Sequence, residues 1–127
     1  MQLCFLVVLA LLFHPQIVKG SMEPQTANEW LSYANTQFHF TDRVLVSIDG
    51  YHKFPGDSRF ETAILNHTQT LYNWSIGKHR EGDYAVALRS YNIILSAPVI
   101  NESIKANTEH LKNYAEQNKR TPDLYYD

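Results

Sequence analysis

Apolar residues recur every three or four positions between Tyr84 and Leu95, a spacing that places them on one face of an α-helix. Asp83 precedes this segment, where its carboxylate can accept hydrogen bonds from the first free N–H groups, and Pro98 follows it, where a helix stops. The sequence therefore predicts an amphipathic helix whose apolar face must be covered by neighbours. That face comprises Tyr84, Ala87, Leu88, Tyr91, Ile94 and Leu95.

The same segment, residues 82–95, resembles the second helix of a tetratricopeptide repeat over about 14 residues. The first-helix signature of that family would fall on residues that do not match it, and a solenoid needs about three stacked repeats. We therefore interpret the apolar stripe as the packing face of a helix hairpin. The unmatched positions are Leu71, Trp74, Ser75 and Lys78.

Another helix is predicted to begin at Thr26 and Glu29, which have the spacing of a capping box. Apolar residues follow at steps of four and seven, so we expect one long helix that ends at Gly50. Its apolar face comprises Trp30, Ala34, Phe38 and Leu45, with Leu31, Thr41 and Ile48 on neighbouring rows.

A β-hairpin is the alternative for part of this segment. Val44, Val46 and Ile48 alternate with other residues ahead of Asp49-Gly50, a dipeptide that favours hairpin turns, and residues 51–54 could form the return strand.

Two more helices complete the predicted fold. Ser58 and Glu61 form a second capping box, opening a helix that we expect to end at Gly77. Asn101 is a suitable cap for the last helix, whose apolar pattern fades by Asn118. We predict an all-α domain resembling a small four-helix bundle, with an α+β fold containing one hairpin around Asp49-Gly50 as the alternative.

The first twenty residues have the pattern of a signal peptide. The apolar run from Leu3 to Phe13 is too short for the ~20 residues that cross a bilayer, and it is followed by breakers and small side chains. We expect cleavage between Gly20 and Ser21, giving a secreted chain with no membrane span. The predicted division is a signal peptide 1–20, a helical domain 21–117 and a polar tail 118–127.

The single cysteine, Cys4, lies inside the predicted signal peptide. The secreted chain would then contain no thiol, which excludes disulfides, thiolate zinc sites and cysteine nucleophiles. The chain also has 11 Lys and Arg against 13 Asp and Glu, so it lacks the basic excess that binds nucleic acid. We expect no nucleic-acid partner.

Three sequons could accept N-linked glycans, at Asn66, Asn73 and Asn101. On a helix Asn66 and Asn73 would face away from the apolar stripe, so glycans there would not disturb the core. At the other end of the chain, the dibasic pair Lys119-Arg120 is a candidate processing site. Tyr125 and Tyr126, beside acidic residues, are candidate sulfation sites.

Catalytic and metal-binding motifs are absent from the sequence. The histidines lack the spacings that put two imidazoles on one metal, and there is no nucleophile elbow or phosphate-binding glycine loop. We therefore predict no enzyme activity, no metal and no cofactor.

A secreted, cysteine-free helical glycoprotein without a catalytic motif is best interpreted as a binding protein. We predict a hormone-like or cytokine-like signal that binds an extracellular protein or receptor, with Trp30, Trp74 and the tyrosines as candidate anchors. The alternatives are a carrier of a small apolar ligand between the helices and a structural or reproductive secretion.

Overall fold

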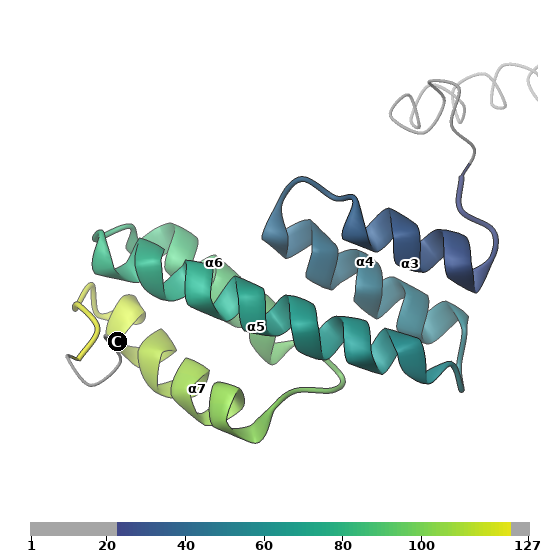
Figure 1. Cartoon of the computed structure of the whole chain (residues 1–127). Coiled ribbons are helices and arrows are strands. Elements are labelled where there is room, and N and C mark those ends of the chain that lie inside the picture. The colour runs from purple at the N-terminus through teal and green to yellow at the C-terminus, as the bar shows by residue number, and fades with distance from the viewer. Residues whose placement is uncertain (1–22, 123–127) are drawn as a thin grey trace, which may run out of the picture.

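The structure of the chain, a computed structural model, describes residues 23–122 and contains five helices and no strand in that range (Figure 1). The all-α prediction is confirmed, and the hairpin alternative is wrong. The helices are α3 (Ala27–Asn35), α4 (Phe40–Lys53), α5 (Ser58–Arg80), α6 (Tyr84–Leu95) and α7 (Glu102–Glu116).

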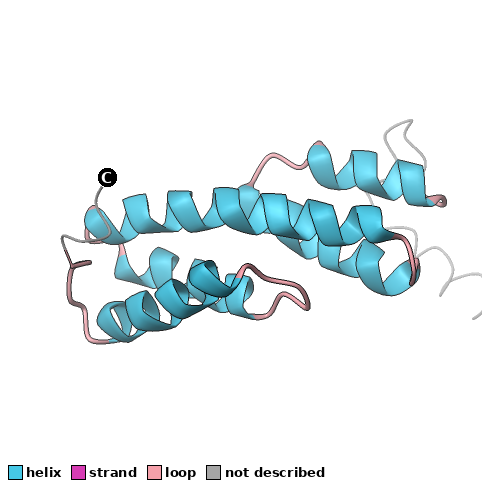
Figure 2. Cartoon of the chain, turned by 60° about the horizontal axis from the view of Figure 1, so that its bottom comes forward, coloured by secondary structure: helices cyan, strands magenta, loops and turns pink. Residues whose placement is uncertain are grey.

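Each helix packs mainly on the helices that precede and follow it in sequence. The 23-residue helix α5 runs the length of the molecule, with α3 and α4 against its first part and α6 and α7 toward its second (Figure 1). Figure 2 shows the elongated shape that results. Within residues 23–122 no helix has the length and apolarity needed to cross a membrane.

The single helix predicted from Thr26 to Gly50 is instead two helices, α3 and α4. The chain turns between them because side chains satisfy the freed backbone groups: Arg43 Nε donates to the Gln37 carbonyl at 2.8 Å, and His39 Nδ1 accepts from the Thr41 N–H at 3.2 Å. The turn removes Phe38 from the predicted apolar face, leaving its side chain 96% exposed. Leu45, from the same predicted face, is 41% exposed.

Two glycines have roles other than the helix stops that we predicted. Gly50 lies inside α4, where a Cβ atom would overlap the rings of Phe60 and Trp30, so the absence of a side chain permits close packing. Gly77 lies inside α5, which continues to Arg80. The turn that follows α5 uses Gly82, whose positive φ of 89° suits a residue without Cβ.

Side-chain caps begin the helices largely as the sequence indicates. Thr26 and Glu29 form the predicted capping box, and Asp83 and Asn101 cap α6 and α7. The start of α5 differs from the prediction because Asp57 is its N-cap and Ser58 is already helical. The Asp57 carboxylate accepts the Arg59 N–H and pairs with its guanidinium, which gives that end a stronger cap than a serine hydroxyl.

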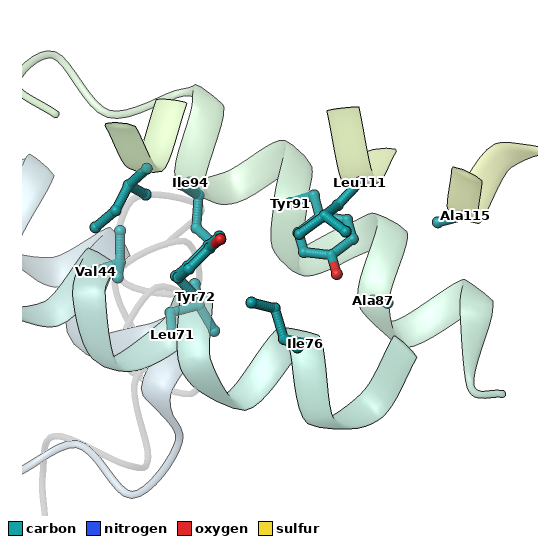
Figure 3. Packing of buried hydrophobic residues seen from close by; sticks show 10 residues of the cluster. Val44, Leu71, Tyr72, Ile76, Ala87, Tyr91, Ile94, Leu111 and Ala115 are labelled. Atoms are coloured by element: carbon teal, nitrogen blue, oxygen red, sulfur yellow. The ribbon is translucent and has the colours of Figure 1, made fainter. Parts of the chain in front are cut away.

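The main hydrophobic cluster lies among α4, α5, α6 and α7 (Figure 3). Small Ala87 and Ala115 alternate with larger aliphatic and aromatic side chains, which lets the helices approach closely. The buried members are Val44, Leu71, Tyr72, Ile76, Ala87, Tyr91, Ile94, Ile104, Leu111 and Ala115. Leu88, which the spacing places on the apolar face, is only partly buried at the edge of the cluster.

Candidate functional site

A groove open to solvent lies between the start of α4, the second half of α5 and α6, with a volume of about 500 Å³. Its lining combines apolar side chains from α6, Val86 and Ile93, with polar and charged side chains. The lining residues are His39, Thr41, Asp42, Trp74, Lys78, Asp83, Val86, Arg89, Ser90 and Ile93.

Trp74 forms the aromatic part of this groove. Its ring meets His39 edge-on with centroids 5.0 Å apart and Phe40 at 6.1 Å, so residues from α4 and the preceding turn fix its position. The Lys78 ammonium lies 5.6 Å from the Trp74 ring centroid, a cation–π arrangement. Trp74 is half-buried, and therefore combines a rigid aromatic surface with access to solvent.

Hydrogen bonds define the orientation and tautomer of His39. Its Nδ1 atom accepts from the Thr41 backbone N–H and is 2.8 Å from the Thr41 hydroxyl. Since Nδ1 must be an acceptor here, the neutral ring carries its proton on Nε2. His39 thus caps α4 and supplies one N–H donor beside Trp74.

Charges of both signs line the groove. Asp42 and Asp83 belong to the first turns or caps of α4 and α6, while Lys78 and Arg89 provide positive charge. The mixture favours a ligand that is itself polar or charged at its edges, because a wholly apolar ligand would desolvate these groups without pairing them.

Phe38 lies immediately before His39 in the turn at this end of the groove and is 96% exposed. Single apolar side chains are common on protein surfaces, and Phe38 is a candidate contact residue because the next residue in the chain, His39, lines the groove. Nothing in the sequence pattern separates it from a core phenylalanine, because its spacing from Ala34 fits a continuous helix.

The two tryptophans predicted as partner anchors have different roles. Trp30 Nε1 donates to the Val46 carbonyl at 2.9 Å, and the Lys53 ammonium lies 5.0 Å from its ring centroid. Trp30 therefore joins α3 to α4, whereas Trp74 lines the groove. Both rings are half-buried, and Trp30 lines a smaller pocket of about 390 Å³ with Lys53 and Phe54.

The three sequon asparagines are exposed, but the hydroxyls of two sequons are not. The Thr68 hydroxyl donates to the Ile64 carbonyl at 2.7 Å and the Ser75 hydroxyl to the Leu71 carbonyl at 2.6 Å, both in the interior. The third, Asn101, accepts the Ile104 N–H as the cap of α7. Glycan attachment at Asn66, Asn73 and Asn101 stays a prediction.

The predicted tail 118–127 begins packed on the helices. Lys119 and Arg120 have exposed side chains, yet the Lys119 carbonyl lies 2.6 Å from His79 Nε2, and Thr121 is 5% exposed. The other predicted processing and modification residues lie outside the described residues. They are Gly20, Ser21, Tyr125 and Tyr126.

His79 is a fully buried histidine that the sequence analysis did not single out. The signal was present, because Leu71, Ser75 and His79 follow one another at steps of four and so share the inner face of α5. Its ring contacts Tyr84 and Tyr91. Among residues 23–122 no group of His, Asp and Glu is arranged to hold a metal ion.

No known protein-family model matches this chain, and no curated protein or solved structure is significantly similar to it. The features that bear on function are therefore the groove, Phe38 and the chemistry of the individual residues.

Proposed function

We propose that this protein is a secreted, non-catalytic helical glycoprotein that acts by binding another extracellular protein, in the manner of a hormone-like or cytokine-like signal. The observation that carries the proposal is Phe38, which is 96% exposed and precedes His39 of the groove that contains Trp74. Aromatic side chains at the centre of a contact surface contribute a large part of protein–protein affinity.

The charged rim of the groove supports a protein partner. Lys78 and Arg89 on one hand, and Asp42 and Asp83 on the other, can pair with opposite charges of a partner around the aromatic centre. Such a rim contributes orientation and specificity, while the desolvated aromatic contact contributes most of the affinity.

The carrier alternative has less support from these contacts. The groove is open and charged, and the main cluster is filled by side chains such as Tyr91, Ile94 and Leu111. A structural or reproductive secretion remains the third alternative, for which the described contacts offer no argument.

Binding of the fluorescently labelled protein to panels of cells in culture tests the proposal. We expect saturable binding to some cell types and at least a tenfold loss of affinity for Phe38→Ser. This variant removes the aromatic ring that would contact the partner, and it should leave the fold unchanged because Phe38 is 96% exposed. Leu65→Ser is the matched control, because Leu65 is 37% exposed on α5 and does not line the groove.

The proposal fails if no cell type binds the protein saturably, or if both variants bind as the parent does. Native mass spectrometry of the protein from its own fluid tests the carrier alternative, which requires a stoichiometric apolar adduct.

A further inference from the structure

The C-terminal strap, residues 118–122, is held against the helices by a hydrogen bond from the core. His79 is fully buried, and its Nε2 atom lies 2.6 Å from the Lys119 carbonyl oxygen. A carbonyl only accepts, so Nε2 carries the proton and donates. Nδ1 is then the acceptor for the Tyr91 hydroxyl, 3.0 Å away. Tyr91, His79 and Lys119 form one directed chain of hydrogen bonds.

The end of α7 directs the strap toward His79. Asn118 adopts a left-handed conformation with φ 54°, and the Lys119 N–H donates to the Tyr114 carbonyl at 2.8 Å. With the bond from the Asn118 N–H to the Ala115 carbonyl, this is a Schellman motif, in which asparagine takes the place usually held by glycine. The backbone is therefore fixed up to the residue that His79 binds.

After the exposed Arg120 the strap is buried at Thr121, but the burial of its hydroxyl is unfavourable. Thr121 is 5% exposed, and its hydroxyl is buried without a hydrogen-bond partner among the described residues. A buried hydroxyl without a partner destabilises the state in which it is buried, because it has lost its hydrogen bonds to water. The strap therefore combines an anchoring hydrogen bond with a destabilising hydroxyl, a combination that favours local opening without unfolding of the helices.

We propose that Lys119-Arg120 is a conditional cleavage site, protected while the strap is bound to His79 and open to a protease of basic-residue specificity once the strap detaches. The reaction is hydrolysis: water adds across the Arg120–Thr121 peptide bond, leaving a carboxylate on Arg120 and a free amino group on Thr121. This proposal is independent of the partner-binding groove.

The bound strap protects the Arg120–Thr121 bond because a protease needs access to an extended backbone. The enzyme must surround the backbone on both sides of the bond that it cuts, and chain segments that supply such access are locally unfolded. Here the Lys119 carbonyl is bound to His79 on one side of the bond, and Thr121 is buried on the other. A protease can therefore reach the exposed side chains of Lys119 and Arg120, but not the backbone on both sides of the Arg120–Thr121 bond.

Limited proteolysis of the purified full chain with trypsin, followed by mass spectrometry, tests the proposal. Each rate is divided by the rate for the same bond in the denatured variant, which removes any preference of the enzyme for the altered sequence. We expect the Arg120–Thr121 bond to be cut far more slowly in the folded protein than in the denatured one. Cleavage after Arg89 in α6 and Lys112 in α7 reports unfolding of the helices.

His79→Ala should speed cleavage at Arg120–Thr121 by about fivefold to tenfold, because the strap loses its anchoring bond and the rate follows the population of the opened state. Cleavage after Arg89 and Lys112 should change much less. His52→Ala is the matched control, since His52 is an exposed histidine of α4, and it should leave all three rates unchanged.

Thr121→Val moves the rate in the opposite direction. It keeps the shape of the side chain and removes the unpaired hydroxyl, so cleavage at Arg120–Thr121 should slow about threefold. If His79→Ala speeds all three cleavages alike, the variant loosens the whole fold and does not test the strap. In that case Thr121→Val is the test, and an unchanged rate of cleavage at Arg120–Thr121 in this variant overturns the proposal. Equal cleavage of the folded and denatured parent chains at this bond also overturns it.

Discussion

The two ends of the molecule differ in the side chains that fill the space between their helices. At the α3 end, on the right in Figure 1, α4 approaches α3 and α5 so closely that Gly50 leaves no space for a Cβ between Phe60 and Trp30. Toward the other end, the main cluster is filled by long aliphatic and aromatic side chains such as Leu111 and Tyr91. The first end is therefore sensitive to an atom added at Gly50, and the second to atoms removed at Leu111.

Truncation in the main cluster should have the largest effect on stability. Leu111→Ala removes a fully buried side chain and leaves a cavity, so we expect the free energy of unfolding to fall by about 2–5 kcal/mol in urea denaturation. Leu88→Ala should cost less, because Leu88 is only partly buried. Equal losses for the two variants would contradict the packing described for α6 and α7.

Addition of one carbon at the α3 end should have the next largest effect. Gly50→Ala should lower the free energy of unfolding by about 1–3 kcal/mol, although alanine favours helix, because its Cβ overlaps two rings. Gly77→Ala is the matched control: nothing lies within 4 Å of the added carbon, so it should stabilise the protein by about 0.5–1 kcal/mol. Two gains of similar size would show that α4 does not approach Phe60 and Trp30 so closely.

Removing a buried hydroxyl from the main cluster region should stabilise it. Thr108 is fully buried on α7, and its hydroxyl has no hydrogen-bond partner among the described residues, so Thr108→Val should raise the free energy of unfolding by up to about 1 kcal/mol. Thr68→Val is the comparison, because the Thr68 hydroxyl already donates to the Ile64 carbonyl and its removal should gain less. Thermal unfolding of the two variants measures the difference.

The smallest effect should be a pH dependence that originates where α3 meets α5. Burial lowers the pKa of His67, with the charge of Arg43 as a smaller cause, and its Nε2 atom lies 2.9 Å from Asn35 Oδ1. The unfolded chain then binds a proton more readily than the folded one, so this contribution to stability is lost as the pH falls below the ordinary value of 6.5.

Urea unfolding at about pH 7.5 and about pH 5.5 measures this loss, which His67→Gln should reduce. His110→Gln is the control, since His110 is exposed on α7. Because His67 is only half-buried, the change should be smaller than those above. An unchanged pH dependence in His67→Gln would assign the effect to other groups.

Helix spacing and caps predicted the main part of the fold because both are local properties. Asp83 and Asn101 cap the helices that follow them as expected, and the stripe from Tyr84 to Leu95 faces the core at Ala87 and Tyr91. The break between α3 and α4 was not predictable in this way. It contains no proline or glycine, and it depends on hydrogen bonds such as that from Arg43 to the Gln37 carbonyl.

The groove and the strap depend on contacts between distant residues. Trp74 was predicted as an anchor from composition alone, but Phe38 was assigned to the core, because the pattern does not show where a continuous helix turns. His79 was predictable as a member of the inner face of α5. Its bond to Lys119, forty positions further along the chain, was not.

The packing of each helix on its neighbours in sequence has a kinetic consequence. Few long loops must close before favourable contacts form, which gives a low contact order, and helical proteins of this kind fold in microseconds to milliseconds. The chain can gain native contacts helix by helix, without waiting for its two ends to meet. In stopped-flow refolding we therefore expect one fast phase, with no slow phase from contacts between residues far apart in the sequence. Such folding suits a chain that has no cysteine, and so no disulfide to guide its assembly, within residues 23–122.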